Sequence, residues 1–164
     1  MTNLGLKGSL PNSLFDMTDL VALYANYNSF SGTIPSSIGG LSSLDELYLY
    51  DSDLTGQIPT QIGSLTGLEI LTLSQNAFSG SLPTELNNLT NLQLLAIQRE
   101  YGQEKGAGIS GLIPSFDQHR KLTALYLENQ NLSGFLDPDF LLECPVSEKV
   151  EVNLRNNNLG GAVQ

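Results

Sequence analysis

Two short motifs have the residue types of ligand-binding loops. Gly106, Gly108 and Gly111 spell G-x-G-x-x-G, the pattern of a dinucleotide loop, which must lie between a strand and a helix. Asp51-Ser52-Asp53 opens like a calcium loop, but Ile62 stands at its twelfth position, where calcium needs a bidentate Glu. Ile109 and Gly111 are already explained by the repeated phrase described below, and Pro114 follows the motif at once. We therefore expect no cofactor and no metal site.

The remaining reactive residue types form no legible catalytic motif, although the sequence leaves a Ser-His-Asp arrangement open. His119 is the only histidine and Cys144 the only cysteine, which excludes an intrachain disulfide and a zinc site made of several such ligands. We expect His119 in a solvated convex loop and Cys144 as a small buried apolar residue. No G-x-S-x-G nucleophile motif occurs. A hydrolase acting through Asp51 and Asp53 is the least favoured hypothesis, and the chain is not expected to be an enzyme.

Two sites fit the N-x-S/T pattern for glycosylation. They are Asn88-Leu89-Thr90 and Asn131-Leu132-Ser133, and both are candidate acceptors if the chain is secreted. The motif is short, and the repeated phrase described below would by itself produce the second one.

A repeated phrase predicts the elements that carry these residues. Leu68 to Pro83 reads L-x-x-L-x-L-x-x-N-x-F-S-G-x-L-P. Its glycine recurs at steps of 24, 24, 24, 31, 23 and 27 residues, namely at Gly8, Gly32, Gly56, Gly80, Gly111, Gly134 and Gly161. A period of 20–29 residues with this leucine spacing indicates a leucine-rich-repeat solenoid.

Each part of the phrase predicts a local structure. The Leu-x-Leu core alternates with a period of two and predicts a short strand. The next slot holds amides that can satisfy backbone groups where the chain leaves the strand, so Ser52 and Glu100 predict a looser ladder there. After each Pro, apolar residues at steps of three predict a 3₁₀ turn. The strand cores and slots are Leu23-x-Ala25 with Asn28, Leu47-x-Leu49 with Ser52, Leu71-x-Leu73 with Asn76, Leu95-x-Ile97 with Glu100, Leu125-x-Leu127 with Gln130 and Val152-x-Leu154 with Asn157.

We therefore predict an α/β solenoid with a parallel sheet and short 3₁₀ or irregular convex segments. Residues 1–164 form a single domain of about six to seven repeats, with an insertion near 98–108 and an irregular repeat at 135–150. The chain begins and ends in almost the same phase of the phrase. This predicts a part of a longer chain, or ends that self-associate, because terminal repeats of a solenoid need caps.

Outward strand positions form columns that could bind a ligand. Five of the six tyrosines lie on these positions, and Tyr is enriched at recognition sites. Cross-strand pairing of tyrosines is an equally weighted explanation. The candidate ligand-binding residues are Tyr24, Asn26, Tyr27, Glu46, Tyr48, Tyr50, Asp51, Thr72, Arg99, Tyr126 and Glu128.

Charge and hydropathy limit the partners. The net charge is −10, which argues against nucleic acid and anionic membrane surfaces. No run reaches the roughly 18 apolar residues of a membrane span, so we expect no direct membrane insertion by this segment. A basic partner is conceivable on the acidic N-terminal part, although a solvated acidic face that aids solubility is the favoured explanation of that charge.

The phrase resembles the plant-specific class of leucine-rich repeat, L-x-x-L-x-L-x-x-N-x-L-S-G-x-I-P. Residues 30–35, 54–59 and 78–83 match it closely. The resemblance, to receptor-like kinase ectodomains and polygalacturonase-inhibitor-like proteins, implies a right-handed superhelix with a concave parallel sheet and a second short β element. It also implies extracellular recognition of peptides, proteins or cell-wall fragments through the outward concave positions, here Tyr24, Tyr48, Tyr50 and Tyr126.

The leading hypothesis is a non-catalytic module that binds a protein or peptide on its concave face. The alternatives are an assembly scaffold that stacks through its terminal repeats and an inhibitor of a cell-wall hydrolase. The location is extracellular or at the cell surface if the parent protein is receptor-like, and a cytoplasmic location stays open.

Overall fold

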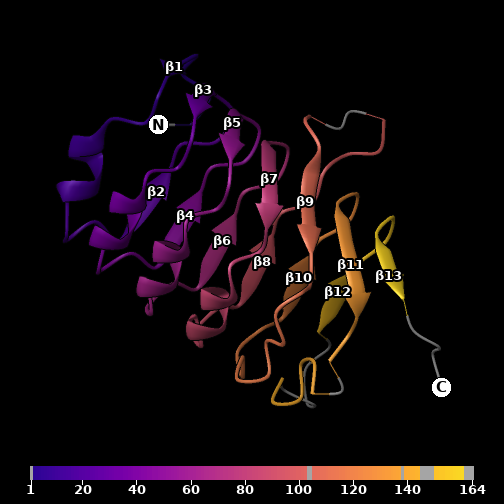
Figure 1. The fold of residues 1–164 in the computed structure, drawn as a ribbon. Coiled ribbons are helices and arrows are strands. Elements are labelled where there is room, and N and C mark those ends of the chain that lie inside the picture. Colours follow the sequence, from indigo (N-terminus) through magenta and orange to yellow (C-terminus); the bar gives the residue numbers. More distant parts are fainter. Residues whose placement is uncertain (1, 103–104, 138, 145–149, 161–164) are drawn as a thin grey trace.

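The computed structural model describes residues 2–102, 105–137, 139–144 and 150–160, which form a solenoid of stacked coils (Figure 1). Along one side lies a six-stranded parallel sheet in the order β12-β10-β8-β6-β4-β2. Each coil supplies one short strand, so neighbours in the sheet are successive repeats. These strands are β2 (Ala22–Tyr24), β4 (Glu46–Tyr48), β6 (Ile70–Thr72), β8 (Leu94–Ala96), β10 (Ala124–Tyr126) and β12 (Glu151–Asn153).

A second parallel sheet comes from the Ser/Thr-Gly part of the phrase, in the order β1-β3-β5-β7-β9-β11-β13. The two sheets and the short turns between them confirm the predicted solenoid and the second β element. The strands are β1 (Lys7–Gly8), β3 (Ser29–Gly32), β5 (Asp53–Gly56), β7 (Ala77–Ser81), β9 (Gly108–Gly111), β11 (Asn131–Phe135) and β13 (Asn158–Gly160).

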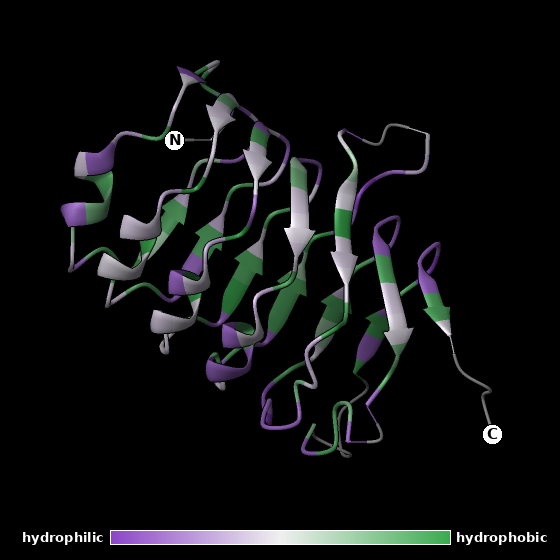
Figure 2. Ribbon diagram, in the orientation of Figure 1, coloured by the Kyte–Doolittle hydropathy of each residue, from purple (hydrophilic) through white to green (hydrophobic). Residues whose placement is uncertain are grey.

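The alternation of each strand core sends its leucines into one continuous interior. The strand leucines Leu47, Leu71, Leu95 and Leu125 have no exposed surface. Figure 2 shows the strands β4, β6 and β8 in the colour of hydrophobic residues. Val152, in β12, differs and is 39% exposed. No coil could bury this apolar edge alone, so the core exists only because the coils stack.

The predicted 3₁₀ turns form along the opposite side of four coils. Each begins directly after a proline in extended conformation, and backbone N–H groups donate to carbonyls three residues back, as from Leu86 to Pro83 and from Leu89 to Leu86. The step of three therefore places one apolar column per turn inside the core. The turns are η1 (Asn12–Asp16), η2 (Ser36–Gly40), η3 (Thr60–Ser64) and η4 (Thr84–Asn88).

The glycine of the Ser/Thr-Gly step leaves room for a side chain of the preceding coil. A Cβ on Gly56 would lie 2.8 Å from Cγ2 of Thr33, and one on Gly80 would lie 2.7 Å from Cγ of Gln57. Both glycines also have a positive φ, +76° and +79°, which favours glycine. The side chain after each glycine therefore covers the glycine of the following coil.

Amide side chains tie successive coils together where the chain leaves each strand. Asn76 donates to the carbonyl of Leu49 in the preceding coil at 2.8 Å and to its own Leu73 at 3.0 Å. Its Oδ1 accepts the backbone N–H of Leu54 at 3.0 Å. Gln130 and Asn157 repeat this bridging. The Ser52 hydroxyl, by contrast, is buried without a hydrogen-bond partner in the described part of the chain, in line with the looser ladder predicted there.

The insertion supplies two cations, Arg99 and Lys105, near Glu100 and Ser52, where the ladder lacks its amide. Arg99 is only 6% exposed, and its guanidinium donates to the carbonyls of Asn129 at 2.7 Å and of Lys105 and Gly106 at 3.2 Å. Lys105 reaches back across the coils to the carbonyl of Ser52 and a carboxylate oxygen of Asp53, both at 2.8 Å. The expectation that Arg99 presents its side chain on the concave face is therefore wrong, because the side chain turns inward to hold the insertion.

His119 is also misplaced by the sequence analysis, because it is fully buried and not in a solvated loop. The turn after Pro114 is one residue shorter than the others, so Phe116, His119 and Leu122 form the inward column. His119 thus occupies the place of Leu89, with Nε2 3.2 Å from the carbonyl oxygen of Leu86. Cys144 is only partly buried, and its thiol donates to the carbonyl of His119 at 3.3 Å.

The closest backbone approach between convex turns gives a first prediction. A Cβ on Gly63 would lie 2.5 Å from both Cβ and the carbonyl oxygen of Glu85 in the next coil. We expect Gly63→Ala to lower the free energy of unfolding by about 1–3 kcal/mol, measured by chemical denaturation. At Gly67 the nearest atom would be 3.4 Å away, so Gly67→Ala should change stability by less than about 0.5 kcal/mol. Equal effects would contradict this packing.

The buried histidine gives a second prediction, on pH. Burial lowers the pKa of His119 below its ordinary value of 6.5, and Nδ1 has no hydrogen-bond partner among the described residues. The unfolded chain therefore binds this proton more tightly, and acid favours unfolding. His119→Leu, which restores the residue type of the column, should gain stability relative to the wild type as the pH falls from about 7 to about 5. Stability profiles of the two proteins that stay parallel across this range would contradict the prediction.

Candidate functional site

The face of the six-stranded sheet that points away from the core presents outward columns, and we call it the concave face. Strand pairing aligns Tyr24, Tyr48, Thr72, Ala96 and Tyr126 in one column. The residues two positions further along each coil form the neighbouring column, which includes Asn26, Tyr50, Ser74, Gln98, Glu128 and Arg155. Their alignment follows from the parallel register, which stacks equivalent positions of successive repeats.

Four tyrosines form a contiguous cluster at the N-terminal end of this face. The rings of Tyr24 and Tyr48 stack with centroids 4.9 Å apart and 26° between planes. Tyr50 contacts Tyr48 at 6.4 Å and Tyr27 at 4.9 Å, both edge to face. Such pairs fix the rings in place, so the cluster offers a rigid aromatic surface.

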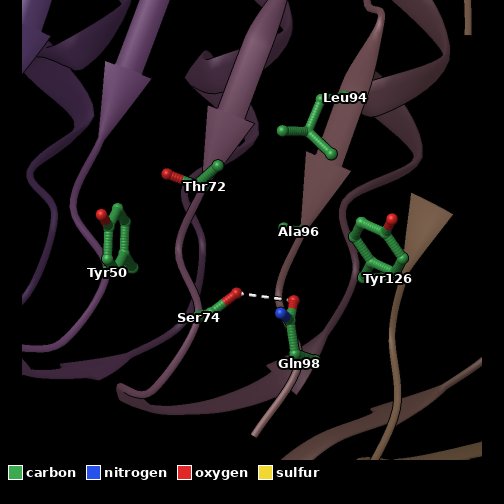
Figure 3. Close-up of a pocket in the computed structure, with 7 residues that line it drawn as sticks. All are labelled: Tyr50, Thr72, Ser74, Leu94, Ala96, Gln98 and Tyr126. Atoms are coloured by element: carbon green, nitrogen blue, oxygen red, sulfur yellow. Dashed lines mark hydrogen bonds between the residues drawn. The ribbon is translucent and has the colours of Figure 1, made fainter. Parts of the chain in front are cut away.

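Beside the cluster lies a hollow of about 230 Å³. Figure 3 shows Tyr50 on one side and Tyr126 on the other, with Thr72 and Ala96 between them. The hollow exists because two small side chains follow one another in a column whose flanking positions are tyrosines. The lining residues are Tyr50, Thr72, Ser74, Leu94, Ala96, Gln98 and Tyr126.

The polar groups around the hollow hold their neighbours in defined positions. Ser74 donates to Oε1 of Gln98 at 2.7 Å (Figure 3). The Tyr126 hydroxyl donates to Glu151 at 2.7 Å, and the Tyr24 hydroxyl donates to Glu46. These hydrogen bonds are the largest cause that raises the pKa of each of the two phenols above its ordinary value.

Carboxylates surround the same surface. Burial raises the pKa of Glu128, and Oε2 of this residue has no hydrogen-bond partner in the described part of the chain. Burial and then the nearby Glu100 raise the pKa of Asp51, and Lys105 offsets part of this effect. A cationic partner would lower the pKa of both carboxyl groups, because it favours their charged forms.

The predicted site residues do not all reach one surface. Tyr24 and Tyr27 are 44% and 50% exposed, and both belong to the cluster. Thr72 is largely buried but lines the hollow. Asn26 is 4% exposed, with Oδ1 accepting a hydrogen bond from the Thr2 hydroxyl, so it offers little to a ligand. Arg99 lies off the face, as described above.

The hollow itself was not anticipated from the sequence. The column read from Tyr48 to Tyr126 contains Thr72 and Ala96 at its centre, and this sequence of large, small, small and large residues is the signal that could have located it. Leu94 and Gln98 also line the hollow; Leu94 lies in β8 with Ala96, and Gln98 lies two residues beyond the end of that strand.

The motifs with possible chemistry receive other roles. Gly108 to Gly111 form strand β9, and the described residues 112–137 after the glycine motif contain no helix. Gly108 leaves space that the Arg99 guanidinium fills. Asp53 pairs with Lys105 at 2.8 Å. No three His, Cys, Asp or Glu side chains gather into a metal-binding group among the described residues. Asn88 and Asn131 are exposed, and their glycosylation stays a prediction.

Comparison with known families and sequences gives one match. A family model for the Leucine Rich Repeat matches residues 19–41 and 67–89. A search of curated protein sequences gave no match. Within the described residues, none of the helices has the length and apolar character needed to span a membrane.

Solved structures are similar over almost the whole chain. The ectodomain of the receptor kinase GASSHO1/SCHENGEN3 from Arabidopsis thaliana, in complex with CASPARIAN STRIP INTEGRITY FACTOR 2, is 34% identical over 97% of this chain and 18% of its own, with a TM-score of 0.86. The plant peptide hormone receptor RGFR1, in complex with RGF2, is 31% identical over 96% of this chain and 24% of its own, with a TM-score of 0.86. A plant ice-binding protein is 29% identical over 96% of this chain and 48% of its own, with a TM-score of 0.81.

The chain thus spans 18% and 24% of the length of the two receptor chains. Its repeat phrase, its two parallel sheets and these matches lead to one conclusion. The chain has the leucine-rich repeats and the fold of plant-type leucine-rich-repeat proteins.

Proposed function

We propose that this chain is a non-catalytic recognition module that binds a peptide, or an extended segment of a protein, on its concave face. The observation that carries the proposal is the hollow between Tyr50 and Tyr126, next to a rigid tyrosine cluster. The leucine-rich-repeat fold is typically a binding module. Two of the similar structures are complexes, one of GASSHO1/SCHENGEN3 with CASPARIAN STRIP INTEGRITY FACTOR 2 and one of RGFR1 with RGF2.

The size of the hollow favours a side chain of a larger partner. Its volume of about 230 Å³ is below the roughly 300–1,000 Å³ of most small-molecule pockets. Leu94, Ala96 and the two flanking tyrosine rings make its lining largely apolar. We therefore expect an apolar or aromatic anchor residue of the peptide to occupy it.

The charge of the surface favours a basic peptide. Glu46, Asp51, Glu128 and Glu151 lie along the concave face, where they outnumber the exposed cation Arg155, and Arg99 is buried. A Lys or Arg side chain of the ligand that pairs with Glu128 would meet a carboxylate whose pKa is raised by burial. Charge complementarity of this kind sets specificity and speeds association.

The receptor-like neighbours support an extracellular or cell-surface location for the parent protein. Stacking through terminal repeats and inhibition of a cell-wall hydrolase stay predictions of the sequence, because the concave hollow favours neither of them.

Selection of peptides from a random display library tests the proposal. We expect the enriched peptides to combine Lys or Arg with an apolar anchor. Ala96→Leu, which fills the hollow, and Tyr50→Ala, which removes a wall, should each weaken the binding of a selected peptide by about tenfold or more, as expected for an anchor worth at least about 1.4 kcal/mol. Calorimetry measures the dissociation constants.

Tyr101→Ala is the matched control, because Tyr101 is an exposed tyrosine on the insertion, outside the lining of the hollow. It should change affinity by less than about twofold, and thermal unfolding should show that all three variants are folded. Peptides whose affinity survives Ala96→Leu and Tyr50→Ala would contradict the proposed site.

A second candidate function, ice binding, rests on the other sheet. Successive strands carry hydroxyl side chains at the same place in the phrase, namely Ser31, Thr55, Ser79, Ser110 and Ser133. Thr55 and Ser110 donate to the glycine carbonyls of their preceding coils at 3.2 Å, which orients the hydroxyls. Strands about 4.8 Å apart would present them to water as a regular array. The similar ice-binding protein adds weight to this candidate.

Ice recrystallisation in the presence of the protein tests this candidate. If the array binds ice, the wild type should slow crystal growth and Thr55→Lys should abolish much of the effect, because a long charged side chain interrupts the array. Tyr50→Ala should leave the effect intact. Crystal growth at the rate of a buffer control would exclude ice binding.

A further inference from the structure

A second hollow, of about 340 Å³, lies outside the concave binding surface and beside the insertion. Its walls come from the insertion on one side and from the edges of the following coils on the other. Amide side chains dominate the lining, whose residues are Arg99, Tyr101, Gly106, Ala107, Asn129, Gln130, Asn131 and Asn156. This is a polar site, unlike the hollow between Tyr50 and Tyr126.

The insertion is held in place over this hollow. Arg99 donates to the carbonyls of Asn129, Lys105 and Gly106. Asn131 donates from Nδ2 to the carbonyl of Ala107, which joins the insertion to the start of β11. The walls are therefore connected by hydrogen bonds on both sides, and a ligand would meet a formed site.

The lining contains unused acceptors for hydroxyl groups. Asn156 donates to Oδ1 of Asn129 at 2.7 Å, but its own Oδ1 and that of Asn131 accept no hydrogen bond among the described residues. Tyr101 is 81% exposed at the rim. Two free amide oxygens and an exposed aromatic ring suit a ligand that donates several hydroxyl hydrogen bonds and has a flat apolar face.

We propose that this hollow binds a neutral saccharide unit. An anionic ligand is disfavoured, because Arg99, the one cation among the described lining residues, is 6% exposed and its guanidinium already donates to three carbonyls. A basic ligand is disfavoured as well, since none of the described residues that line the hollow carries a carboxylate. Sugar hydroxyls would donate to the oxygens of Asn131 and Asn156, and the C–H face of the ring would pack on Tyr101.

Saturation-transfer NMR with oligosaccharides tests the proposal. The probes are cellotriose, xylotriose, maltotriose and chitotriose, with the anionic trisaccharide of galacturonic acid as the charged comparison. Protein from bacterial cells leaves Asn131 without a glycan that could fill the hollow. We expect saturation transfer to at least one neutral trisaccharide and weaker transfer to the anionic one.

Variants locate the binding. Tyr101→Ala and Asn156→Leu should each weaken the binding of the neutral trisaccharide by about threefold to tenfold. This is the range expected for the loss of one ring contact or one hydrogen bond. Tyr24→Ala, on the concave face, is the control and should leave saccharide affinity unchanged, so failure of the peptide site and failure of this site are distinguishable. Absence of transfer from every neutral probe, preference for the anionic probe, or binding that Tyr101→Ala leaves unchanged would overturn the proposal.

Discussion

Hydrogen bonding between successive coils is the constraint on which this structure depends. Each coil is too short to bury its leucines or to satisfy its backbone alone, so every strand pairs with the equivalent strand of its neighbours. Amides such as Asn76 extend this pairing to the corner where the chain leaves the strand. Near Ser52 and Glu100, which lack that amide, Lys105 and Arg99 donate to backbone carbonyls. The described part of the insertion is therefore joined to the ladder through Arg99 and Lys105.

The same register produces the candidate binding surfaces. Because equivalent positions align from coil to coil, one substitution in a repeat changes one place in a column, and two small residues between tyrosines open a hollow of about 230 Å³. Burial by neighbouring coils also raises the pKa of Asp51 and Glu128. The concave face thus combines an apolar recess with carboxylates that a cation would stabilise. The hollow beside the insertion differs in chemistry, since Asn131 and Asn156 supply neutral acceptors there.

The repeat phrase predicted most of the fold, because a period-two core and a step of three leave few alternatives once the coils must stack. Prediction failed where the period itself changes. One residue is missing after Pro114, which moves His119 into the column that holds leucine elsewhere. The alternation of the strand predicts an outward side chain at Arg99. The insertion begins at this residue, however, and hydrogen bonds to the carbonyls of Lys105 and Gly106 turn the side chain inward. The hollow depends on the relative size of neighbouring side chains in a column, which the pattern of polar and apolar residues does not encode.

The central claim is that ligand recognition uses the concave face between the tyrosine cluster and Tyr126. The most direct test is NMR of protein with ¹³C-labelled tyrosine rings, because five of the six tyrosines lie on outward strand positions and Tyr101 lies on the insertion. On titration with a selected basic peptide, we expect the ring signals of Tyr48, Tyr50 and Tyr126 to shift while that of Tyr101 stays unchanged. A titration that shifts Tyr101 alone, or leaves Tyr50 and Tyr126 unmoved at saturation, would contradict the claim.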